Sequence, residues 1–143
     1  MSTDNLNDSL QELVRRATDA RQCALARYSN FCVGAALDAE GGVYTGCNVE
    51  SAAYEQTICA ERVAIWKALS EGERKFRRLC VVVDTERLTP PCGACRQVIW
   101  EFCGDIPVTL ANLRGDAVTY RMKELLPHPF DAGFLEEAAA DQK

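Results

Sequence analysis

Two short cysteine-containing stretches constrain this chain more than any other feature of its sequence. They are Cys59-Ala60-Glu61-Arg62 and Pro91-Cys92-Gly93-Ala94-Cys95. Together they supply three thiols and one carboxylate, and each stands where a helix is expected to begin. Three protein ligands are what a catalytic zinc requires if its fourth position is to stay open for water. The pattern therefore predicts a metal site built from Cys59, Cys92 and Cys95.

The spacing of the cysteines distinguishes this metal site from two alternatives. Cys92 and Cys95, taken alone, would equally suit a redox pair or half of a structural zinc site. A structural zinc has four ligands, and the fourth is expected from another close pair. Cys59 has no cysteine or histidine three residues away, and the single histidine of the chain is His128. The spacing thus favours an open, catalytic zinc. We expect the remaining cysteines to be small buried hydrophobes: Cys23, Cys32, Cys47, Cys80 and Cys103.

Glu61 and Arg62 are the polar residues of the first stretch. In the first turn of a helix, Glu61 can lean toward the site of Cys59, where it would move a proton from the zinc water to a substrate nitrogen. The alternative is a surface glutamate that interacts with the helix dipole. Three thiolates on Zn²⁺ leave a net negative charge, and Arg62 is a candidate to offset it by hydrogen bonding to a sulfur. The alternative, with the same weight, is that Arg62 is an ordinary surface residue.

The composition is that of an ordinary globular chain of 143 residues, with 48% hydrophobic and 26% charged residues. We expect one domain over residues 1–143. The net charge of −5 argues against a nucleic-acid partner, because such proteins neutralise phosphates with a basic surface. The basic residues from Arg74 to Arg78 suggest the solvated exit of a helix. Neither a signal sequence nor an apolar run of the ~20 residues that a membrane span needs is found, so we expect a cytoplasmic protein with reduced cysteines.

Apolar periodicity predicts alternating helices and strands. Helices are expected at residues 4–27, 58–69 and 94–102, strands at 31–37, 43–49, 79–83, 108–111 and 117–120, and a loosely organised tail from residue 124. This order predicts an α/β fold, a three-layer α/β/α sandwich around a mixed five-stranded sheet.

The two cysteine stretches match the signature of zinc-dependent nucleoside deaminases. Three further blocks resemble the short-chain cytidine deaminases: Tyr28–Leu37, Gly46–Tyr54, and Glu124–Pro127 together with Phe130. Two positions depart from the usual family pattern, since Cys32 replaces a proline and Ser51 replaces an asparagine. The resemblance covers most of the chain, from Tyr28 to Phe130.

The resemblance implies hydrolytic deamination of cytidine or deoxycytidine, a reaction of pyrimidine salvage, with one Zn²⁺ per chain and Glu61 as the proton carrier. It implies that Asn48 and Glu50 hydrogen-bond the ribose 3′-hydroxyl and that Phe31 lines the pyrimidine and sugar pocket. The backbone at Ala60 and Glu61 is implied to meet the edge of the base. Without the resemblance, Asn48 and Glu50 lie two apart on a strand and face one side, where they could equally be exposed to solvent.

The resemblance also implies a homotetramer, in which Phe130 reaches into the active site of a neighbouring subunit. The nearest rival function is a deaminase of the same fold that acts on modified cytosines or on a blasticidin-S-like compound. A polynucleotide-editing deaminase is disfavoured by the acidic composition. From a different class, a non-enzymatic structural-zinc or thiol-redox protein is the distant alternative.

Overall fold

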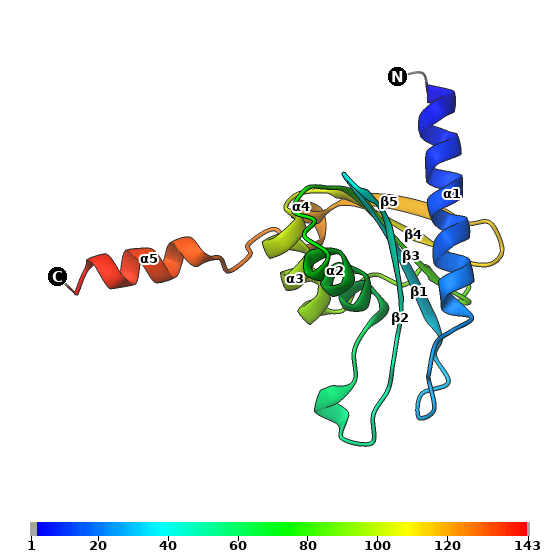
Figure 1. Cartoon of the computed structure of the whole chain (residues 1–143), viewed down its shortest axis with the longest axis horizontal. Coiled ribbons are helices and arrows are strands. Elements are labelled where there is room, and N and C mark those ends of the chain that lie inside the picture. The colour runs from blue at the N-terminus through cyan, green and yellow to red at the C-terminus, as the bar shows by residue number, and fades with distance from the viewer. Residues whose placement is uncertain (1–2, 143) are drawn as a thin grey trace.

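A five-stranded mixed sheet forms the middle layer of the chain, with the strand order β2-β1-β3-β4-β5 (Figure 1). The structure, a computed structural model, describes the backbone of residues 3–142 and the side chains of residues 7–142. The strands are β1 (Val33–Ala39), β2 (Gly42–Cys47), β3 (Phe76–Val83), β4 (Pro107–Ala111) and β5 (Ala117–Arg121). Strands β3 and β4 are parallel, and the other neighbouring pairs are antiparallel. The predicted mixed five-stranded sheet is confirmed.

Helices cover both faces of this sheet. Helix α1 (Thr3–Arg21) packs on one face, while α2 (Ala60–Ser70) and α3 (Gly93–Cys103) pack on the other (Figure 1). A short 3-10 helix, η1 (Tyr54–Gln56), lies in the long loop before α2. Helix α4 (Met122–Leu125) follows β5, and α5 (Ala132–Ala140) extends away from the sheet. The three-layer α/β/α arrangement is therefore confirmed.

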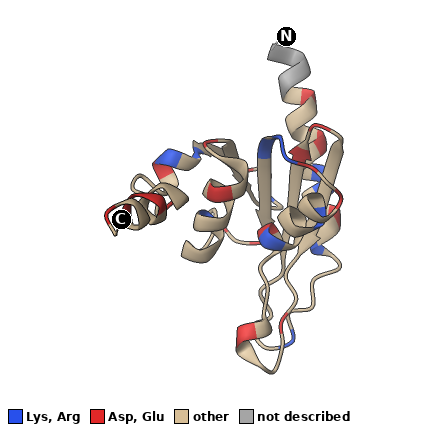
Figure 2. Cartoon of the chain, turned by 60° about the vertical axis from the view of Figure 1, so that its left-hand side comes forward, with Lys and Arg blue, Asp and Glu red and all other residues tan. Residues whose placement is uncertain are grey.

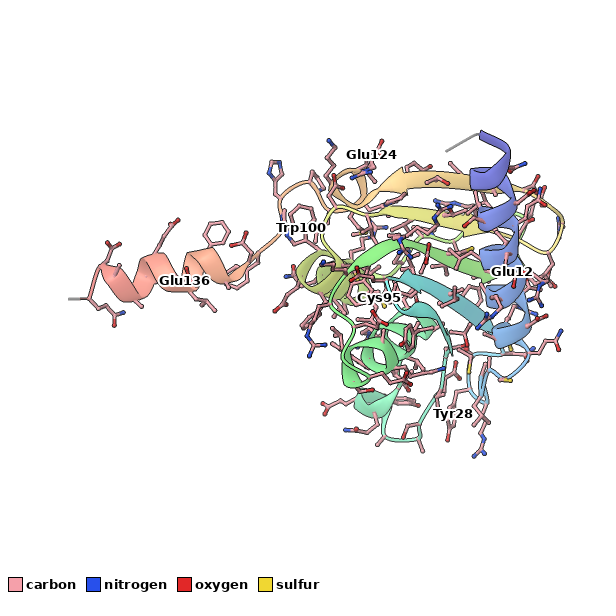
Figure 3. The ribbon with its side chains drawn as sticks, turned by 45° about the horizontal axis from the view of Figure 1, so that its top comes forward. Glu12, Tyr28, Cys95, Trp100, Glu124 and Glu136 are labelled. Carbon is pink, nitrogen blue, oxygen red and sulfur yellow. The ribbon has the colours of Figure 1, made fainter. Side chains whose placement is uncertain are left out.

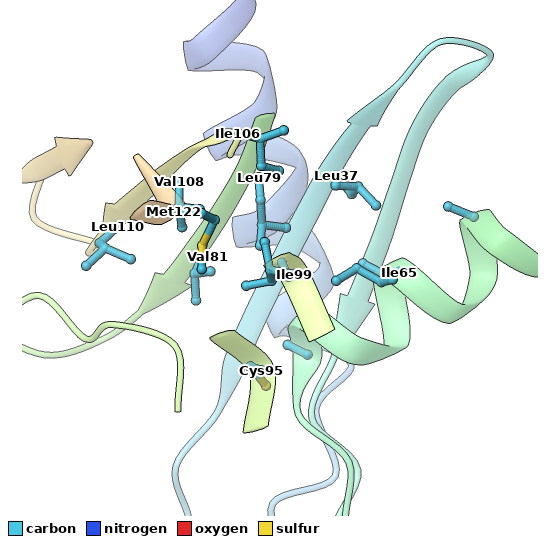
Figure 4. Packing of buried hydrophobic residues seen from close by; sticks show 14 of the residues in the cluster. Leu37, Ile65, Leu79, Val81, Cys95, Ile99, Ile106, Val108, Leu110 and Met122 are labelled. Atoms are coloured by element: carbon cyan, nitrogen blue, oxygen red, sulfur yellow. The ribbon is translucent and has the colours of Figure 1, made fainter. Parts of the chain in front are cut away.

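Successive side chains of β3 point to opposite faces of the sheet, and they join two separate core clusters, one on each face. Leu79 and Val81 join the larger cluster, which includes Ile65 of α2 and Ile99 of α3 (Figure 4). Cys80 and Val82 point the other way, where they pack with Leu13 and Ala17 of α1. A strand covered on both faces is expected to be a continuous apolar run, as this one is.

Strand directions bring the two cysteine stretches to one edge of the sheet. Strand β1 is antiparallel to both β2 and β3, so β2 and β3 run in the same direction and end at the same edge. The loop after β2 returns through the bridge between Val49 and Ile58, and α2 begins directly afterwards. The loop after β3 leads into α3. Both helices therefore begin at the edge where β2 and β3 end.

The first helix is shorter than its sequence pattern predicts. It ends at Arg21 rather than at residue 27. The reason is a tertiary contact: the Leu25 N–H donates to Asn48 O at 3.0 Å, and the Glu50 N–H donates to Leu25 O at 2.9 Å. The chain leaves the helix in order to pair with the extension of β2. Leu6, which the sequence places on the apolar side of this helix, lies outside the described side chains.

Three other predictions were wrong in part. Arg77 and Arg78 belong to β3 rather than to a helix exit, and both lie within 4.0 Å of the Asp38 carboxylate on β1. Of the five cysteines expected to be buried, only Cys80 is. Cys32, Cys47 and Cys103 are partly buried, and Cys23 is exposed because the early end of α1 places it in a surface turn. The tail is not loosely organised, because it forms α4 and α5.

The surface of the described chain carries mixed charge. Basic and acidic positions are interspersed over the sheet and its helices, while α5 carries only acidic charges (Figure 2). None of the helices within residues 3–142 is long and apolar enough to cross a membrane.

Gly46 sets the close approach of β2 to the start of α2. A Cβ at this position would lie 2.3 Å from the carbonyl oxygen of Ala60 and 2.7 Å from the backbone nitrogen of Ala64. We expect Gly46→Ala to lower the free energy of unfolding by roughly 1–3 kcal/mol, measured by urea denaturation, because the helix must shift. Gly93→Ala is the control, since its Cβ would meet nothing within 4 Å. Equal stability of the two variants would contradict this account.

Candidate active site

Three cysteine sulfurs converge where α2 and α3 begin. Cys59 is the N-cap residue of α2, Cys92 is the N-cap residue of α3, and Cys95 lies in the first turn of α3. Their Sγ atoms all lie within 4.8 Å of one another, and those of Cys59 and Cys92 are 3.9 Å apart. A tetrahedral zinc with bonds of about 2.3 Å separates two sulfur ligands by about 3.8 Å. The three sulfurs therefore fit a single zinc ion.

The protonation states of the neighbouring thiols depend on one another. The Cys95 thiol and the Arg62 guanidinium act as donors toward the Cys59 sulfur and lower the pKa of Cys59 to about 5. The same contact with Cys59, together with burial, raises the pKa of Cys95. A divalent cation is what allows neighbouring thiols to ionise together, since metal binding releases their protons. Three soft sulfur donors are a set that zinc prefers.

Arg62 contacts the predicted metal site directly. Its Nη2 donates to Cys59 Sγ at 3.5 Å. The side chain is partly buried, and its Nε is fully buried with no hydrogen-bond partner among the described residues. The structure thus favours the sulfur-bonded alternative over a surface arginine.

Glu61 lies in the wall of the cavity beside these sulfurs. It is the second residue of α2 and is only 4% exposed. Burial raises the pKa of Glu61 to about 7, and the charge of the nearby Cys59 sulfur adds to the rise. A carboxyl group with such a pKa exists in both protonation states near neutral pH, as a group that accepts and donates protons must. The alternative of a surface glutamate does not hold.

The cavity next to the sulfurs has a volume of about 380 Å³, within the range of small-molecule sites. Phe31, Asn48 and Glu50 line it together with Glu61 and two of the cysteines, so three of the predicted substrate-binding residues and the predicted catalytic residue meet in one space. The sequence analysis missed three polar lining residues: Ser29, Thr57 and Thr89. Ser29 lies within the block Tyr28–Leu37, and Thr57 and Thr89 precede Cys59 and Cys92 by two and three residues, but no pattern marked these side chains as cavity residues.

Asn48 and Glu50, here called the clamp residues, hold the segment that carries Phe31. Asn48 is 7% exposed; its Nδ2 donates to Phe31 O at 2.7 Å, and its Oδ1 accepts from the Val33 N–H at 2.8 Å. Glu50 Oε1 accepts from the backbone N–H groups of residues 28 and 29 at 2.8 and 2.9 Å. Glu50 Oε2 accepts from the Ser29 hydroxyl. Both clamp residues line the cavity; Asn48 is buried there, whereas Glu50 is only partly buried.

Two predicted substrate-binding residues are not brought into the cavity of their own chain. Ala60 is fully buried at the start of α2, and its carbonyl oxygen faces Gly46. Phe130 is 56% exposed and stacks on Phe134 of α5, with ring centroids 5.6 Å apart. Its carbonyl accepts from Gln97 Nε2 at 2.6 Å, at the point where α5 leaves the body that holds Cys95 (Figure 3).

Cys59→Ala tests the metal assignment. We expect the wild-type chain to hold one zinc ion and Cys59→Ala to lose most of it, because two thiolates leave the coordination sphere incomplete. Zinc per chain is measured by elemental analysis after gel filtration. Cys103→Ala is the matched control, since Cys103 is a partly buried cysteine at the far end of α3. If both variants keep one zinc ion, Cys59 is not a ligand.

Comparison with known proteins agrees with this geometry. Residues 7–110 match the model of the cytidine and deoxycytidylate deaminase zinc-binding region, a range that contains all three cysteines. The chain is 51% identical over 132 residues to a cytidine deaminase of Sporosarcina psychrophila, covering 91% of this chain and 97% of that protein. It resembles the crystal structure of cytidine deaminase from Burkholderia pseudomallei with a TM-score of 0.81 and 44% identity, over 84% of this chain and 98% of that chain. A blasticidin-S deaminase of Bacillus cereus is 32% identical, covering 89% of this chain and 96% of its own length. The chain belongs to the zinc-dependent cytidine and deoxycytidylate deaminase family.

Proposed function

We propose that this chain deaminates free cytidine or deoxycytidine by hydrolysis, giving uridine or deoxyuridine and ammonia. One observation carries the proposal: a three-sulfur metal site, a buried carboxyl group and the clamp residues meet at a single cavity of nucleoside size. The metal site and the carboxyl group supply hydrolytic chemistry, and the clamp residues supply contacts for a sugar.

Glu61 is the residue that moves protons in this proposal. A zinc ion held by Cys59, Cys92 and Cys95 supplies a coordination position at which water becomes more acidic. Glu61 accepts a proton from the attacking water and donates it to N3 of the pyrimidine ring. The remaining hydroxide bonds to C4. Glu61 then takes the proton of this new C4 hydroxyl and delivers it to the 4-amino group, so that the C4–N bond breaks, the C4 carbonyl forms and ammonia leaves. Burial of Glu61 keeps these transfers away from bulk water.

The unused hydrogen-bonding capacity of the clamp residues matches one hydroxyl group. A carboxylate offers about four acceptor positions, and three of those on Glu50 are taken. The Asn48 amide group has two donors, one of which is taken by Phe31 O. One donor on Asn48 and one acceptor position on Glu50 thus remain, beside a second lone pair on Asn48 Oδ1. A hydroxyl group that accepts from Asn48 and donates to Glu50 uses this donor and this carboxylate position. This supports recognition of the 3′-hydroxyl of a sugar.

The rival substrates are modified cytosines and blasticidin-S-like compounds. The higher identity to a cytidine deaminase, 51% against 32% for the blasticidin-S deaminase, favours cytidine. The clamp residues also favour a ribose or deoxyribose. Turnover of cytidine compared with that of blasticidin S separates the two substrates.

The Glu61→Gln variant tests the mechanism. The amide cannot carry the proton, so we expect zinc to be retained while kcat falls by about 10²–10⁴-fold. Loss of cytidine absorbance measures turnover, and elemental analysis measures zinc. Glu71→Gln is the control, because Glu71 is an exposed glutamate at the opposite end of α2. Near-wild-type turnover in Glu61→Gln would overturn the assignment.

We further propose a cytoplasmic homotetramer with active sites shared between subunits. Helix α5 supports it, because Phe134 and Leu135 are 55% and 63% exposed on a helix that leaves the body of its own chain (Figure 1). In the proposed assembly Phe130, at the base of α5, enters the cavity of a neighbouring subunit. All eight cysteines are free thiols, which suits a reducing compartment.

Mixing two defective variants tests the shared site. A Phe130→Ala chain keeps its own Glu61, and it can receive Phe130 from a neighbouring Glu61→Gln chain. After subunit exchange at equal amounts, we expect about a quarter of the sites to be complete and activity to exceed the average of the separate variants. Sedimentation should give four times the 15.8 kDa of one chain. Activity equal to that average would show that Phe130 serves only its own chain or none.

A further inference from the structure

Ser29 links two parts of the cavity wall, the Glu50 carboxylate and the backbone of Phe31. Its hydroxyl donates to Glu50 Oε2 and accepts from the Phe31 N–H at 3.0 Å. The side chain also lines the cavity. A single hydroxyl group therefore connects the carboxylate of a clamp residue to the aromatic residue of the pocket wall.

The turn that contains Ser29 has a backbone that needs support. Asn30 has a φ of +57°, the one positive φ outside glycine among the described residues. Left-handed backbone is disfavoured for a residue with a side chain, although asparagine tolerates it better than most. Glu50 accepts from two backbone N–H groups of this turn, and Ser29 accepts from a third. The side chains of Ser29 and Glu50 thus hold one another in position through their hydrogen bond.

We propose that Ser29 is a positioning residue that orients Glu50 toward the 3′-hydroxyl of the nucleoside and so contributes to selection of that hydroxyl. This inference rests on the proposed function. With the Ser29 hydroxyl on Oε2 and two N–H groups on Oε1, the carboxylate cannot rotate without breaking three hydrogen bonds. The acceptor position that remains on Oε2 is held in one direction before substrate binds.

Electrostatics agrees with this role. The Ser29 hydroxyl is the main reason that the pKa of Glu50 lies below its ordinary value, followed by the backbone N–H of the same residue. Because these donors stabilise the ionised form of Glu50, its carboxylate accepts hydrogen bonds and donates none. A carboxylate in that state accepts a bond from a sugar hydroxyl and does not compete as a donor with Asn48.

A purely structural role for Ser29 makes a different prediction. If the hydroxyl served only to hold the turn, its removal would displace Phe31 and weaken every nucleoside alike. If it acts through Glu50, its removal harms a substrate with a 3′-hydroxyl and spares one without it. The comparison of cytidine with 3′-deoxycytidine therefore separates the two roles.

The test is a comparison of Ser29→Ala with the wild-type chain on both nucleosides. For cytidine we expect kcat/KM to fall by about three- to tenfold, mainly through KM, which is the size of one net hydrogen bond. For 3′-deoxycytidine we expect a change within about twofold, because the partner hydroxyl is absent. Ser29→Thr keeps the hydroxyl and should restore cytidine turnover. The double variant Ser29→Ala/Glu50→Gln should have nearly the same kcat/KM for cytidine as Glu50→Gln alone, because both substitutions act on the contact between Glu50 and the 3′-hydroxyl.

Ser51→Ala is the matched control. The Ser51 hydroxyl accepts from the backbone N–H two residues later at 3.1 Å, as Ser29 does at 3.0 Å, but Ser51 does not line the cavity. Ser51→Ala should therefore leave kcat/KM unchanged for both cytidine and 3′-deoxycytidine.

If Ser29→Ala does not fold, Ser29→Cys replaces it, because a thiol is a weaker donor than a hydroxyl group. Ser29→Cys should show the same selective loss on cytidine to a smaller degree. Equal losses on both nucleosides would overturn the role of Ser29, whereas a wild-type chain that does not convert cytidine would overturn the proposed function instead.

Discussion

The whole site depends on two helices that begin at one edge of the sheet. Because β2 and β3 run in the same direction, the chain leaves both strands on the side where Cys59 and Cys92 stand. The two sulfurs are separated by 33 residues in the sequence and by 3.9 Å in space. Gly46 permits the approach on one side by leaving room for the start of α2. The metal site is thus a consequence of strand direction.

The same edge explains why the substrate cavity lies next to the sulfurs. Strand β1 begins there, so the segment before it, which carries Phe31, lies beside the extension of β2. Asn48 and Glu50 come directly after β2 and bond to that segment from opposite ends of Phe31. Residues that were expected only to bind a ligand also build the wall of its pocket. Replacing either one therefore changes both binding contacts and local order.

How far the sequence predicts this structure depends on the range of each interaction. The apolar run of β3 and the helix starts at Cys59 and Cys92 are encoded locally, and they were predicted correctly. The end of α1 was not, because the hydrogen bonds of Leu25 to Asn48 and Glu50 override a helical pattern that continues past Arg21.

Side-chain partners show the same limit. The burial of Glu61 follows from packing between distant elements, and the position of Cys23 follows from the early end of α1. Ser29 gave no signal of its own, because its partner Glu50 is 21 residues away. Spacing within a motif identified the three sulfurs and the neighbouring carboxyl group. The contacts that orient them needed the fold.

The charge of the metal site links this geometry back to the chemistry. Three thiolates donate more negative charge than a zinc ion neutralises, which opposes the acidification of a bound water. The fold offsets this in two ways. Both helices direct their positive N-terminal ends toward the sulfurs, and Arg62 donates to Cys59. An all-thiolate site suits hydrolysis here because the helix starts that bring the sulfurs together also stabilise their charge.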